Sequence, residues 1–289
     1  MRIGIIGLGL MGGSFGRTLV KQGVHEVFGY DISPAVMEKA ELIKAFNGVL
    51  DDKAVKNIDM LIVATTPDVF KPAVEKVIKD LKKGAIIVDF CGVKRKIMDD
   101  MASLQKTRPD LVFIGGHPMA GREFSGIEHA ITTLFDKASM ILVNLNADVF
   151  ALDKVKKFFL SVGFSEVVIT SADNHDAMIA YTSQLCHVVS NAFIKNKTAE
   201  KHFGYSAGSY KDLTRVARLN PDMWTELMFD NGDKLLSELS EYIDNLTKYR
   251  DALAAGDRAA FKELLSEGNA RKLAIDTKAA KIKEKLCLN

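Results

Sequence analysis

The stretch Ile-Gly-Ile-Ile-Gly-Leu-Gly-Leu-Met-Gly-Gly, residues 3–13, places a glycine-rich turn between a strand-like run and a helix-like run. Its Gly7, Gly9 and Gly12 have the GxGxxG spacing of a dinucleotide-binding turn. The first glycine permits the tight turn, the second lets backbone approach a pyrophosphate, and the third lets helix and strand pack closely. The spacing alone is a weak signal, but the strand before it and the helix of residues 13–22 after it supply the required context. We therefore expect a Rossmann-type nucleotide-binding unit.

The second strand-like run, residues 26–30, is followed by an acidic residue that bears on the choice of cofactor. Asp31 comes about twenty residues after the last glycine of the turn, where a carboxylate accepts hydrogen bonds from ribose hydroxyls. Its charge would repel the 2′-phosphate of NADP, and Ile32 and Ser33 offer no arginine to neutralise that phosphate, so we expect NAD. The alternative is that Asp31 caps a helix beginning near Pro34. The predicted cofactor contacts are Gly7, Gly9, Leu10, Met11, Gly12 and Asp31, with Thr65 and Thr66 after another strand-like run.

Short β-branched runs recur through the first part of the chain and alternate with helix-like segments. The runs are residues 3–6, 26–30, 60–64, 85–90, 111–114, 140–143 and 166–169. Helix-like segments lie between most of them, notably at residues 69–81 and 94–105. Apolar runs separated by amphipathic stretches are typical of buried parallel strands in a doubly wound sheet.

After Ser171 the strand signals stop and the remaining sequence is typical of helices. The helix-like segments are residues 174–195, 210–217, 231–255 and 258–285. Gly256 and Asp257 separate the last two with a break and a cap. We expect an α/β fold in which a Rossmann-type doubly wound domain, residues 1–171, is followed by an all-α domain, residues 172–289.

The composition limits the classes of partner. The chain has 289 residues, 47% of them hydrophobic, and a formal charge of only +2, so we expect neither nucleic acid nor an anionic membrane as a partner. Three cysteines without a CxxC pair favour neither a disulfide framework nor a zinc site, and no metal is expected. No run approaches the roughly 18 apolar residues of a spanning helix. Only Met1 and Arg2 precede the first strand, so we expect no cleavable signal and a cytoplasmic location.

Three polar segments lie outside the predicted cofactor turn. Residues 115–123 read GGHPMAGRE, residues 181–187 read YTSQLCH, and residues 209–224 read SYKDLTRVARLNPDMW. With the GxGxxG turn, these segments resemble the prephenate dehydrogenase family. Its pattern is HPMAG, then S-[HQ]-L-P-H, then G-F-[RK]-D-x-T-R-x-A followed by asparagine or aspartate, proline and tryptophan. HPMAG together with the TR-containing stretch is a specific signal, and the resemblance covers most of the chain.

The resemblance implies an activity and an organisation. A family member would oxidise and decarboxylate prephenate to 4-hydroxyphenylpyruvate in tyrosine biosynthesis, with hydride transfer to NAD. The first domain would bind NAD, and the helical domain would mediate homodimerisation. The active site would lie between the domains. Competing readings are an arogenate dehydrogenase, more remotely a β-hydroxyacid dehydrogenase, and a non-catalytic NAD-sensing protein.

The resemblance also implies roles for single residues. His117 matches the family histidine that hydrogen-bonds the 4-hydroxyl of the substrate, and it follows the strand of residues 111–114 at the carboxyl edge of the sheet. It could instead be a loop histidine that caps the turn before Pro118. Arg215 matches the arginine that binds a substrate carboxylate through its planar fork, or it pairs with Asp212 on the surface.

The remaining predicted substrate contacts lie on the second and first polar segments. Ser183 and His187 match pocket-lining positions four residues apart, and so on one helix face, although His187 could also be a satisfied histidine in an apolar helix. Gln184 and Glu123 complete the set. Asp176 matches an acidic family position near the site, or it belongs only to the first turn of its helix.

The chain departs from the family pattern at one position that matters for the chemistry. Gly92 stands where many members have a serine that supports the catalytic histidine, so we expect water or Cys91 to supply that hydrogen bond. Gln184 is neutral, and a neutral pocket favours the keto group of prephenate over the ammonium group of arogenate. Spacing assigns no role to the other histidines, which are His25, His129, His175 and His202.

Overall fold

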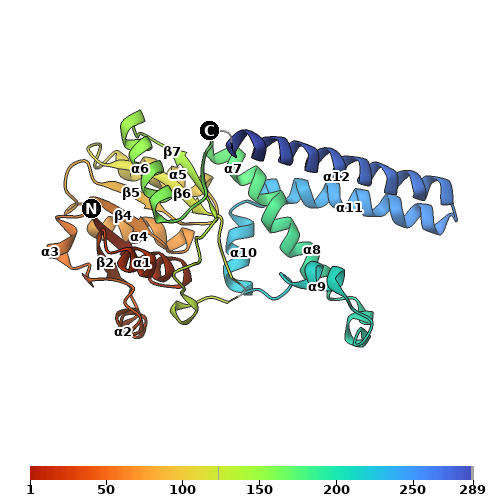
Figure 1. Cartoon of the computed structure of the whole chain (residues 1–289), viewed down its shortest axis with the longest axis horizontal. Helices are drawn as coiled ribbons and strands as arrows, with labels where there is room; N and C mark the ends of the chain where they lie inside the picture. Colours follow the sequence, from red (N-terminus) through yellow and green to blue (C-terminus); the bar gives the residue numbers. More distant parts are fainter. Residues whose placement is uncertain (123, 288–289) are drawn as a thin grey trace. The chain divides into compact units, whose positions relative to one another are not determined.

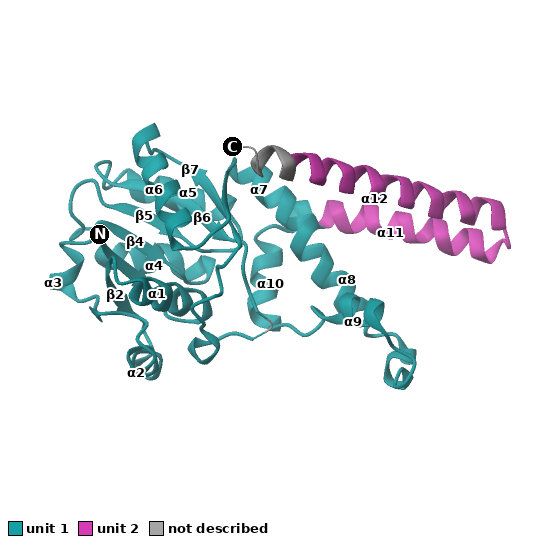
Figure 2. Ribbon diagram, viewed as in Figure 1, with its two compact units in different colours: residues 1–235 teal, residues 236–289 magenta. Residues whose placement is uncertain are grey.

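A single eight-stranded sheet forms the base of the first part of the molecule (Figure 1). The computed structural model describes residues 1–122 and 124–287. Residues 1–235 form one compact unit and residues 236–289 a second (Figure 2). The strands are β1 (Arg2–Ile6), β2 (Glu26–Tyr30), β3 (Gly48–Val49), β4 (Met60–Val63), β5 (Ile86–Asp89), β6 (Val112–Pro118), β7 (Ser139–Asn144) and β8 (Glu166–Ile169).

The strand order is β3-β2-β1-β4-β5-β6-β7-β8, and every neighbouring pair is parallel except β6 and β7. The predicted doubly wound α/β fold is confirmed, but the expectation of a wholly parallel sheet is wrong at β7. The connection from β6 to β7 carries a 3-10 turn, η1 (Ile127–His129), instead of the crossover α-helix that joins parallel strands. The two-residue strand β3 also escaped prediction, because it is too short to show a pattern.

Helices cover the two faces of the sheet and bury it on both sides (Figure 1). In the first unit they are α1 (Leu10–Gln22), α2 (Pro34–Leu42), α3 (Asp52–Val55), α4 (Pro67–Val77), α5 (Arg95–Gln105) and α6 (Val149–Val162). On β4, Met60 and Ile62 point into one apolar cluster, whereas Leu61 and Val63 point into the other. Alternate residues therefore face opposite cores, which explains why this run is apolar throughout.

The helical part of the first unit continues from β8. Its elements are α7 (Ala172–Ile179), the π-helical segment η2 (Ala180–Leu185), α8 (Cys186–Phe193), the 3-10 turn η3 (Lys197–Lys201), α9 (Gly208–Thr214) and α10 (Pro221–Phe229). The single α-helix expected over residues 174–195 is thus interrupted by a π segment. Because the π segment adds residues to a turn without breaking the helix, apolar spacing does not reveal it.

A pair of long helices forms the second unit. Helix α11 (Gly232–Ala254) begins at the end of the first unit, and α12 (Arg258–Cys287) follows after a short turn. Gly256 has a positive φ of 65° and the Asp257 carboxylate accepts a hydrogen bond from the Ala260 N–H at 2.9 Å, which confirms the predicted break and cap. The Tyr249 hydroxyl donates to the Leu264 carbonyl at 3.1 Å and joins the two helices. None of the helices described is long and apolar enough to span a membrane.

Candidate active site

The glycine-rich turn between β1 and α1 has the geometry expected of a dinucleotide site. Gly7 has a φ of 86°, which only glycine adopts without strain. A Cβ atom on Gly12 would lie 1.9 Å from the Gly7 carbonyl oxygen, so this position must be glycine for helix and strand to pack. A Cβ atom on Gly9 would meet nothing within 4 Å. The backbone at Gly9 therefore borders open space, and the first N–H groups of α1, at Leu10 and Met11, are the groups that could hold a pyrophosphate there.

Asp31 lies at the carboxyl end of β2, beside this turn. Its Oδ2 accepts a hydrogen bond from the Leu8 N–H at 2.8 Å, and its Oδ1 accepts one from the Ser33 N–H at 2.9 Å. Ser33 caps helix α2 by accepting from the Val36 N–H at 3.4 Å, so the alternative in which Asp31 is the cap is wrong. Each carboxylate oxygen has a second lone pair, which leaves Asp31 able to accept from ribose hydroxyls.

The two threonines predicted at the cofactor edge lie between β4 and α4. Thr66 is the N-cap residue of α4, and Thr65 is half-buried with its carbonyl oxygen 3.3 Å from the Cys91 sulfur. Strands β1 and β4 are parallel neighbours, so Thr65 stands at the same sheet edge as the glycine-rich turn. Contact of these residues with the cofactor stays a prediction.

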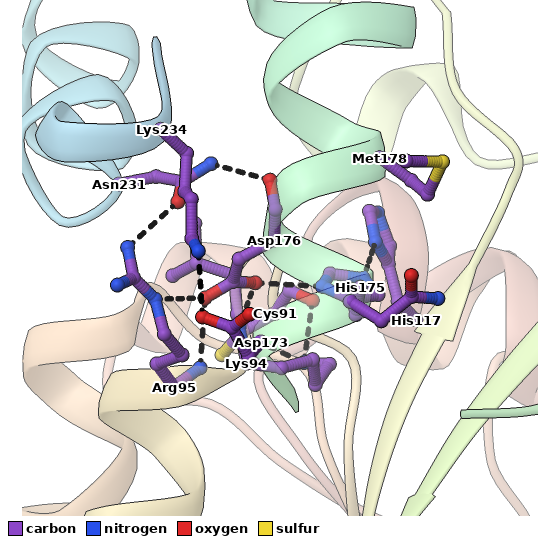
Figure 3. Close-up of polar contacts among 12 residues, drawn as sticks. Cys91, Lys94, Arg95, His117, Asp173, His175, Asp176, Met178, Asn231 and Lys234 are labelled. Carbon is purple, nitrogen blue, oxygen red and sulfur yellow. Dashed lines mark hydrogen bonds and ion pairs between the residues drawn. The ribbon is translucent and has the colours of Figure 1, made fainter. Parts of the chain in front are cut away.

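His117 lies at one end of a chain of polar contacts that leads through His175 to Asp176 (Figure 3). It lies inside β6, where it pairs with Ile141 of β7, so the expected position after a strand ending at residue 114 is wrong. Its Nδ1 lies 2.9 Å from His175 Nε2, and His175 Nδ1 lies 2.7 Å from Asp176 Oδ1. His175 and Asp176 are buried in α7. His117 is therefore not a loop histidine capping a turn.

Asp176 connects this chain to the start of helix α5. Its Oδ1 also accepts a hydrogen bond from the Lys94 N–H at 2.7 Å, and its Oδ2 accepts from the Arg95 N–H at 2.9 Å and from Arg95 Nε at 3.3 Å. A carboxylate is favoured there because the first N–H groups of a helix lack helical partners. Burial alone would raise the pKa of Asp176, but the bonds from His175, Arg95 and Lys94 outweigh burial and hold the pKa below its ordinary value.

A fully buried ion pair lies next to His117. Lys94 Nζ is 2.5 Å from Asp89 Oδ2 and also donates to the carbonyl oxygens of Cys91 and Val93, at 2.8 and 3.0 Å. Asp89 Oδ1 accepts from the N–H of Gly116, the residue before His117, at 2.9 Å. The charges balance, and the polar groups that the chain buries here are paired.

The surroundings of His117 keep its imidazole neutral. Burial lowers the pKa of His117 well below its ordinary value, and the positive charge of Lys94 lowers it further. Burial also lowers the pKa of His175. A neutral imidazole can accept a proton from a substrate hydroxyl at neutral pH, which is what a general base requires.

Gln184, predicted to bind substrate, is instead part of the packing. Its side chain is only 1% exposed. Its Nε2 donates to the Leu227 carbonyl at 2.8 Å, and its Oε1 accepts from Asn231 Nδ2 at 2.8 Å. Asn231 Nδ2 also donates to the Asp176 carbonyl at 2.8 Å. Both ends of the Gln184 amide are thus engaged by the protein, and we no longer assign it to the substrate.

Three other predicted substrate residues lie in the helical part: His187 on α8, Ser183 in the π segment and Arg215 at the C-cap of α9. His187 Nδ1 is 3.0 Å from the Val216 carbonyl oxygen, and its ring centroid is 3.9 Å from that of Trp224. Burial lowers the pKa of His187, and the neighbouring charge of Arg215 lowers it further. The structure therefore brings His187, Arg215 and Trp224 together. Ser183 is half-buried in the π segment, and Glu123 lies outside the described residues.

Comparison with known proteins identifies the family. Residues 15–168 match the family described as prephenate dehydrogenase, nucleotide-binding domain, and residues 171–267 match prephenate dehydrogenase, dimerization domain. The chain belongs to the prephenate dehydrogenase family. It is therefore an oxidoreductase of the group that acts in tyrosine biosynthesis on prephenate, arogenate or related cyclohexadienyl compounds.

Three relatives of this prephenate dehydrogenase family member span nearly its whole length. The cyclohexadienyl dehydrogenase of Zymomonas mobilis is 30% identical, over 95% of this chain and 96% of the relative. The prephenate dehydrogenase of A. aeolicus, solved in complex with hydroxyphenyl propionate and NAD+, has a TM-score of 0.80 and 26% identity, over 95% of this chain and 98% of that one. The arogenate dehydrogenase of Synechocystis has a TM-score of 0.78 and 26% identity, over 95% and 100% of the two chains.

Membership of the prephenate dehydrogenase family makes Gly92 notable, because many members have serine there. Cys91 does not replace that serine, since its buried thiol is directed at the Thr65 carbonyl oxygen, at 3.3 Å. Burial also raises the pKa of the Cys91 thiol well above its ordinary value. The hydrogen-bond partner of His117 Nδ1 is instead His175.

Sequence reasoning missed His175, Lys94 and Asp89, which surround His117. His175 is 58 residues from His117, and no spacing rule links them. The only local signal was the adjacent His175-Asp176 pair in a helix predicted to be mostly apolar. Among the described residues no group of three or more histidine, cysteine or acidic side chains could hold a metal ion.

Proposed function

We propose that the protein catalyses the oxidative decarboxylation of prephenate to 4-hydroxyphenylpyruvate with NAD as hydride acceptor. The observation that carries this proposal is the neutral imidazole of His117 at the carboxyl edge of the sheet that also bears the glycine-rich turn and Asp31. Ligands of doubly wound folds bind at that edge. The NAD+ named with the A. aeolicus structure supports the choice of cofactor.

His117 would act as the base and then as the acid. Bound NAD⁺ supplies a nicotinamide ring that accepts the hydride leaving C4 of the substrate. His117 accepts the proton of the 4-hydroxyl as the C–O bond becomes a carbonyl. Cleavage of the bond to the ring carboxylate then releases CO2 and sends its electron pair through the ring to that oxygen. His117 returns the proton to the oxygen, so a phenol forms and no net proton is released.

We assign the substrate carboxylates to the group around His187. Arg215 offers two parallel donors to a carboxylate, and such charge-assisted bonds are roughly twice as strong as neutral ones. His187 and Ser183 lie on the adjoining helical run and would line the same pocket. Cofactor contacts are assigned to Gly7, Gly9, Leu10, Met11, Gly12, Asp31, Thr65 and Thr66.

The charge of the site favours prephenate over arogenate, which carries an ammonium group in place of the side-chain keto group. An ammonium group would need a free carboxylate. Asp176 is the carboxylate that His175 connects to His117. It already accepts four hydrogen bonds, from His175, from Lys94 and twice from Arg95. Gln184 is buried and has no part in this preference. Arogenate is the second candidate, supported by similarity to the arogenate dehydrogenase of Synechocystis.

The test is to follow NADH formation with prephenate and arogenate, each supplied with NAD⁺ or NADP⁺, and to identify the products by chromatography. We expect the highest kcat/KM with prephenate and NAD⁺, and 4-hydroxyphenylpyruvate as the product. A preference for arogenate with tyrosine as the product would transfer the assignment to the second candidate. NAD⁺ binding without turnover of either substrate would reject the enzymatic function.

We also propose that the protein is a homodimer formed through its helical part. The match to a dimerization domain over residues 171–267 supports this assembly. Helix α11 exposes Leu236, Ile243, Leu246 and Leu253, whose spacing of seven, three and seven residues is that of a coiled-coil seam. An exposed apolar stripe of this length is typical of a protein interface.

Sedimentation equilibrium should therefore give twice the mass of the chain. The double variant Ile243→Glu and Leu246→Glu places charges in the stripe and should shift the protein to the monomer. The matched control Glu241→Gln and Asp244→Asn changes two exposed positions of the same helix that are not part of the stripe, and it should leave the dimer intact. A monomeric wild type would refute the proposed assembly.

The described cysteines support a reducing compartment. Cys91 and Cys186 are both free thiols, and cytoplasmic proteins keep thiols reduced. We therefore propose a cytoplasmic location.

A further inference from the structure

The contacts of Asp176 determine which of its neighbours carry protons. Its two oxygens face the backbone N–H groups of Lys94 and Arg95, the Arg95 guanidinium and His175 Nδ1. The first three are obligatory donors, so Asp176 is an ionised acceptor and does not carry a proton of its own. His175 Nδ1, 2.7 Å from Asp176 Oδ1, must therefore be the protonated nitrogen of that ring.

The tautomer of His175 determines the tautomer of His117. A neutral imidazole has one N–H, so protonation of His175 at Nδ1 leaves its Nε2 with a lone pair. His117 Nδ1 lies 2.9 Å from that lone pair and must donate to it. His117 is then protonated at Nδ1, and its Nε2 is the nitrogen with a free lone pair. Burial of His175 and Asp176 keeps water from competing for these bonds.

We propose that His175 and Asp176 are positioning residues, which hold His117 in the Nδ1-protonated tautomer so that Nε2 accepts the hydroxyl proton of the substrate. This inference rests on the proposed function for its chemical meaning and deepens it. The arrangement supplies a bond that orients the catalytic ring in a site where Gly92 has no side chain to do so. It resembles the way a carboxylate selects the tautomer of a catalytic histidine in hydrolases.

The contacts of His117 with His175, and of His175 with Asp176, also stabilise the positive charge that forms during the reaction. When His117 accepts a proton at Nε2, its Nδ1–H bond to His175 strengthens, and the ionised Asp176 stabilises the positive charge through the His175 ring. The donors around Asp176 favour its ionised form, so the proton stays on the imidazoles and can be returned to the product oxygen.

The first test identifies the tautomers of His117 and His175 by NMR, without any substrate or cofactor. Long-range ¹H–¹⁵N correlation spectra of protein labelled with [¹⁵N]histidine distinguish Nδ1–H from Nε2–H rings, and His117→Asn and His175→Phe assign the signals. We expect both His117 and His175 as neutral Nδ1–H tautomers. An Nε2–H signal for His117 would overturn the proposal, whether or not the protein turns over prephenate.

The second test compares two substitutions of one residue. His175→Phe keeps a ring but removes both nitrogens, so kcat should fall by roughly 10- to 10²-fold, the usual effect of losing the partner that orients a functional histidine, with KM unchanged. His175→Gln keeps an acceptor for His117 and a donor for Asp176 and should recover most of kcat. The matched control His25→Phe, at the amino end of β2, should behave as wild type.

The outcomes distinguish the positioning role of His175 from a merely structural role and from the proposed function. Equal losses in His175→Phe and His175→Gln, with the His117 signal still Nδ1–H in both, would show that packing alone matters and would overturn the proposal. Wild-type kcat in His175→Phe would overturn it too. Folding of each variant is checked by the fluorescence of Trp224, the only tryptophan. If wild type fails to oxidise prephenate, the proposed function fails, and the tautomer spectra still decide the positioning role.

Discussion

Replacing His117 with asparagine should lower kcat for prephenate by roughly 10²- to 10⁴-fold, the usual contribution of a positioned acid or base. Asparagine can still donate a hydrogen bond to His175, but it cannot take up the hydroxyl proton. The Kd for NAD⁺ should not change, because the glycine-rich turn and Asp31 follow β1 and β2 and make no contact with the His117 ring among the bonds described. Stopped-flow kinetics measure kcat, and isothermal titration calorimetry with NAD⁺ measures the Kd.

The pH dependence provides an independent check on His117. A base whose pKa is lowered stays unprotonated to lower pH, so kcat/KM should stay level as pH falls through the ordinary histidine value of 6.5 and decline only well below it. This acid limb should disappear in His117→Asn, whereas the control His25→Asn should keep both the limb and the rate. Full turnover in His117→Asn would remove this residue from the mechanism.

Replacing Lys94 with methionine should lower the free energy of unfolding of the first unit by about 3 to 5 kcal/mol, because it leaves a buried carboxylate without its cation. Lys94 and Asp89 have fully buried side chains, and Lys94 Nζ also satisfies two backbone carbonyls. After the substitution, Asp89 keeps only the N–H groups of Cys91 and Gly116 as donors. Urea unfolding followed by Trp224 fluorescence reports on this unit.

A matched substitution distinguishes burial from ion pairing as the cause. Lys157 pairs with Asp153 at 2.6 Å on the exposed face of α6, and Lys157→Met should change the free energy of unfolding little. Adding Asp89→Asn to Lys94→Met removes the unpaired buried carboxylate and should restore part of the lost free energy of unfolding. Equal small effects at Lys94 and Lys157 would contradict the role we give to burial. Loss of the Lys94 charge should also raise the pKa of His117 and move the acid limb to higher pH.

The features that the sequence predicted correctly depend on short segments. The glycine-rich turn needs φ values and close packing that only Gly7 and Gly12 allow, and these demands are local. The break at Gly256 and the cap at Asp257 are likewise decided within a few residues. HPMAG around His117, together with the TR-containing stretch around Arg215, indicated the family, which the comparisons then confirmed.

The features that only the tertiary structure decided depend on residues far apart in the chain. Strand β7 pairs antiparallel with β6, and Gln184 of the π segment is hydrogen-bonded to Leu227 and Asn231. No local period encodes these contacts. Gln184 looked like a pocket residue because its neighbours match the family, yet its burial gives it another role.

By itself, then, the sequence determined the class of fold and the glycine-rich turn, since turns, caps and apolar periods act over a few residues, and its motifs singled out the His117 imidazole for the role that we propose. It did not determine the protonation of that imidazole. His117, His175 and Asp176 come into line only when β6 and α7 meet in space, and the tautomer follows from donors and acceptors that the folded chain brings within 3 Å. Hydrogen bonding of this kind is a property of the assembled site and has no signature in spacing.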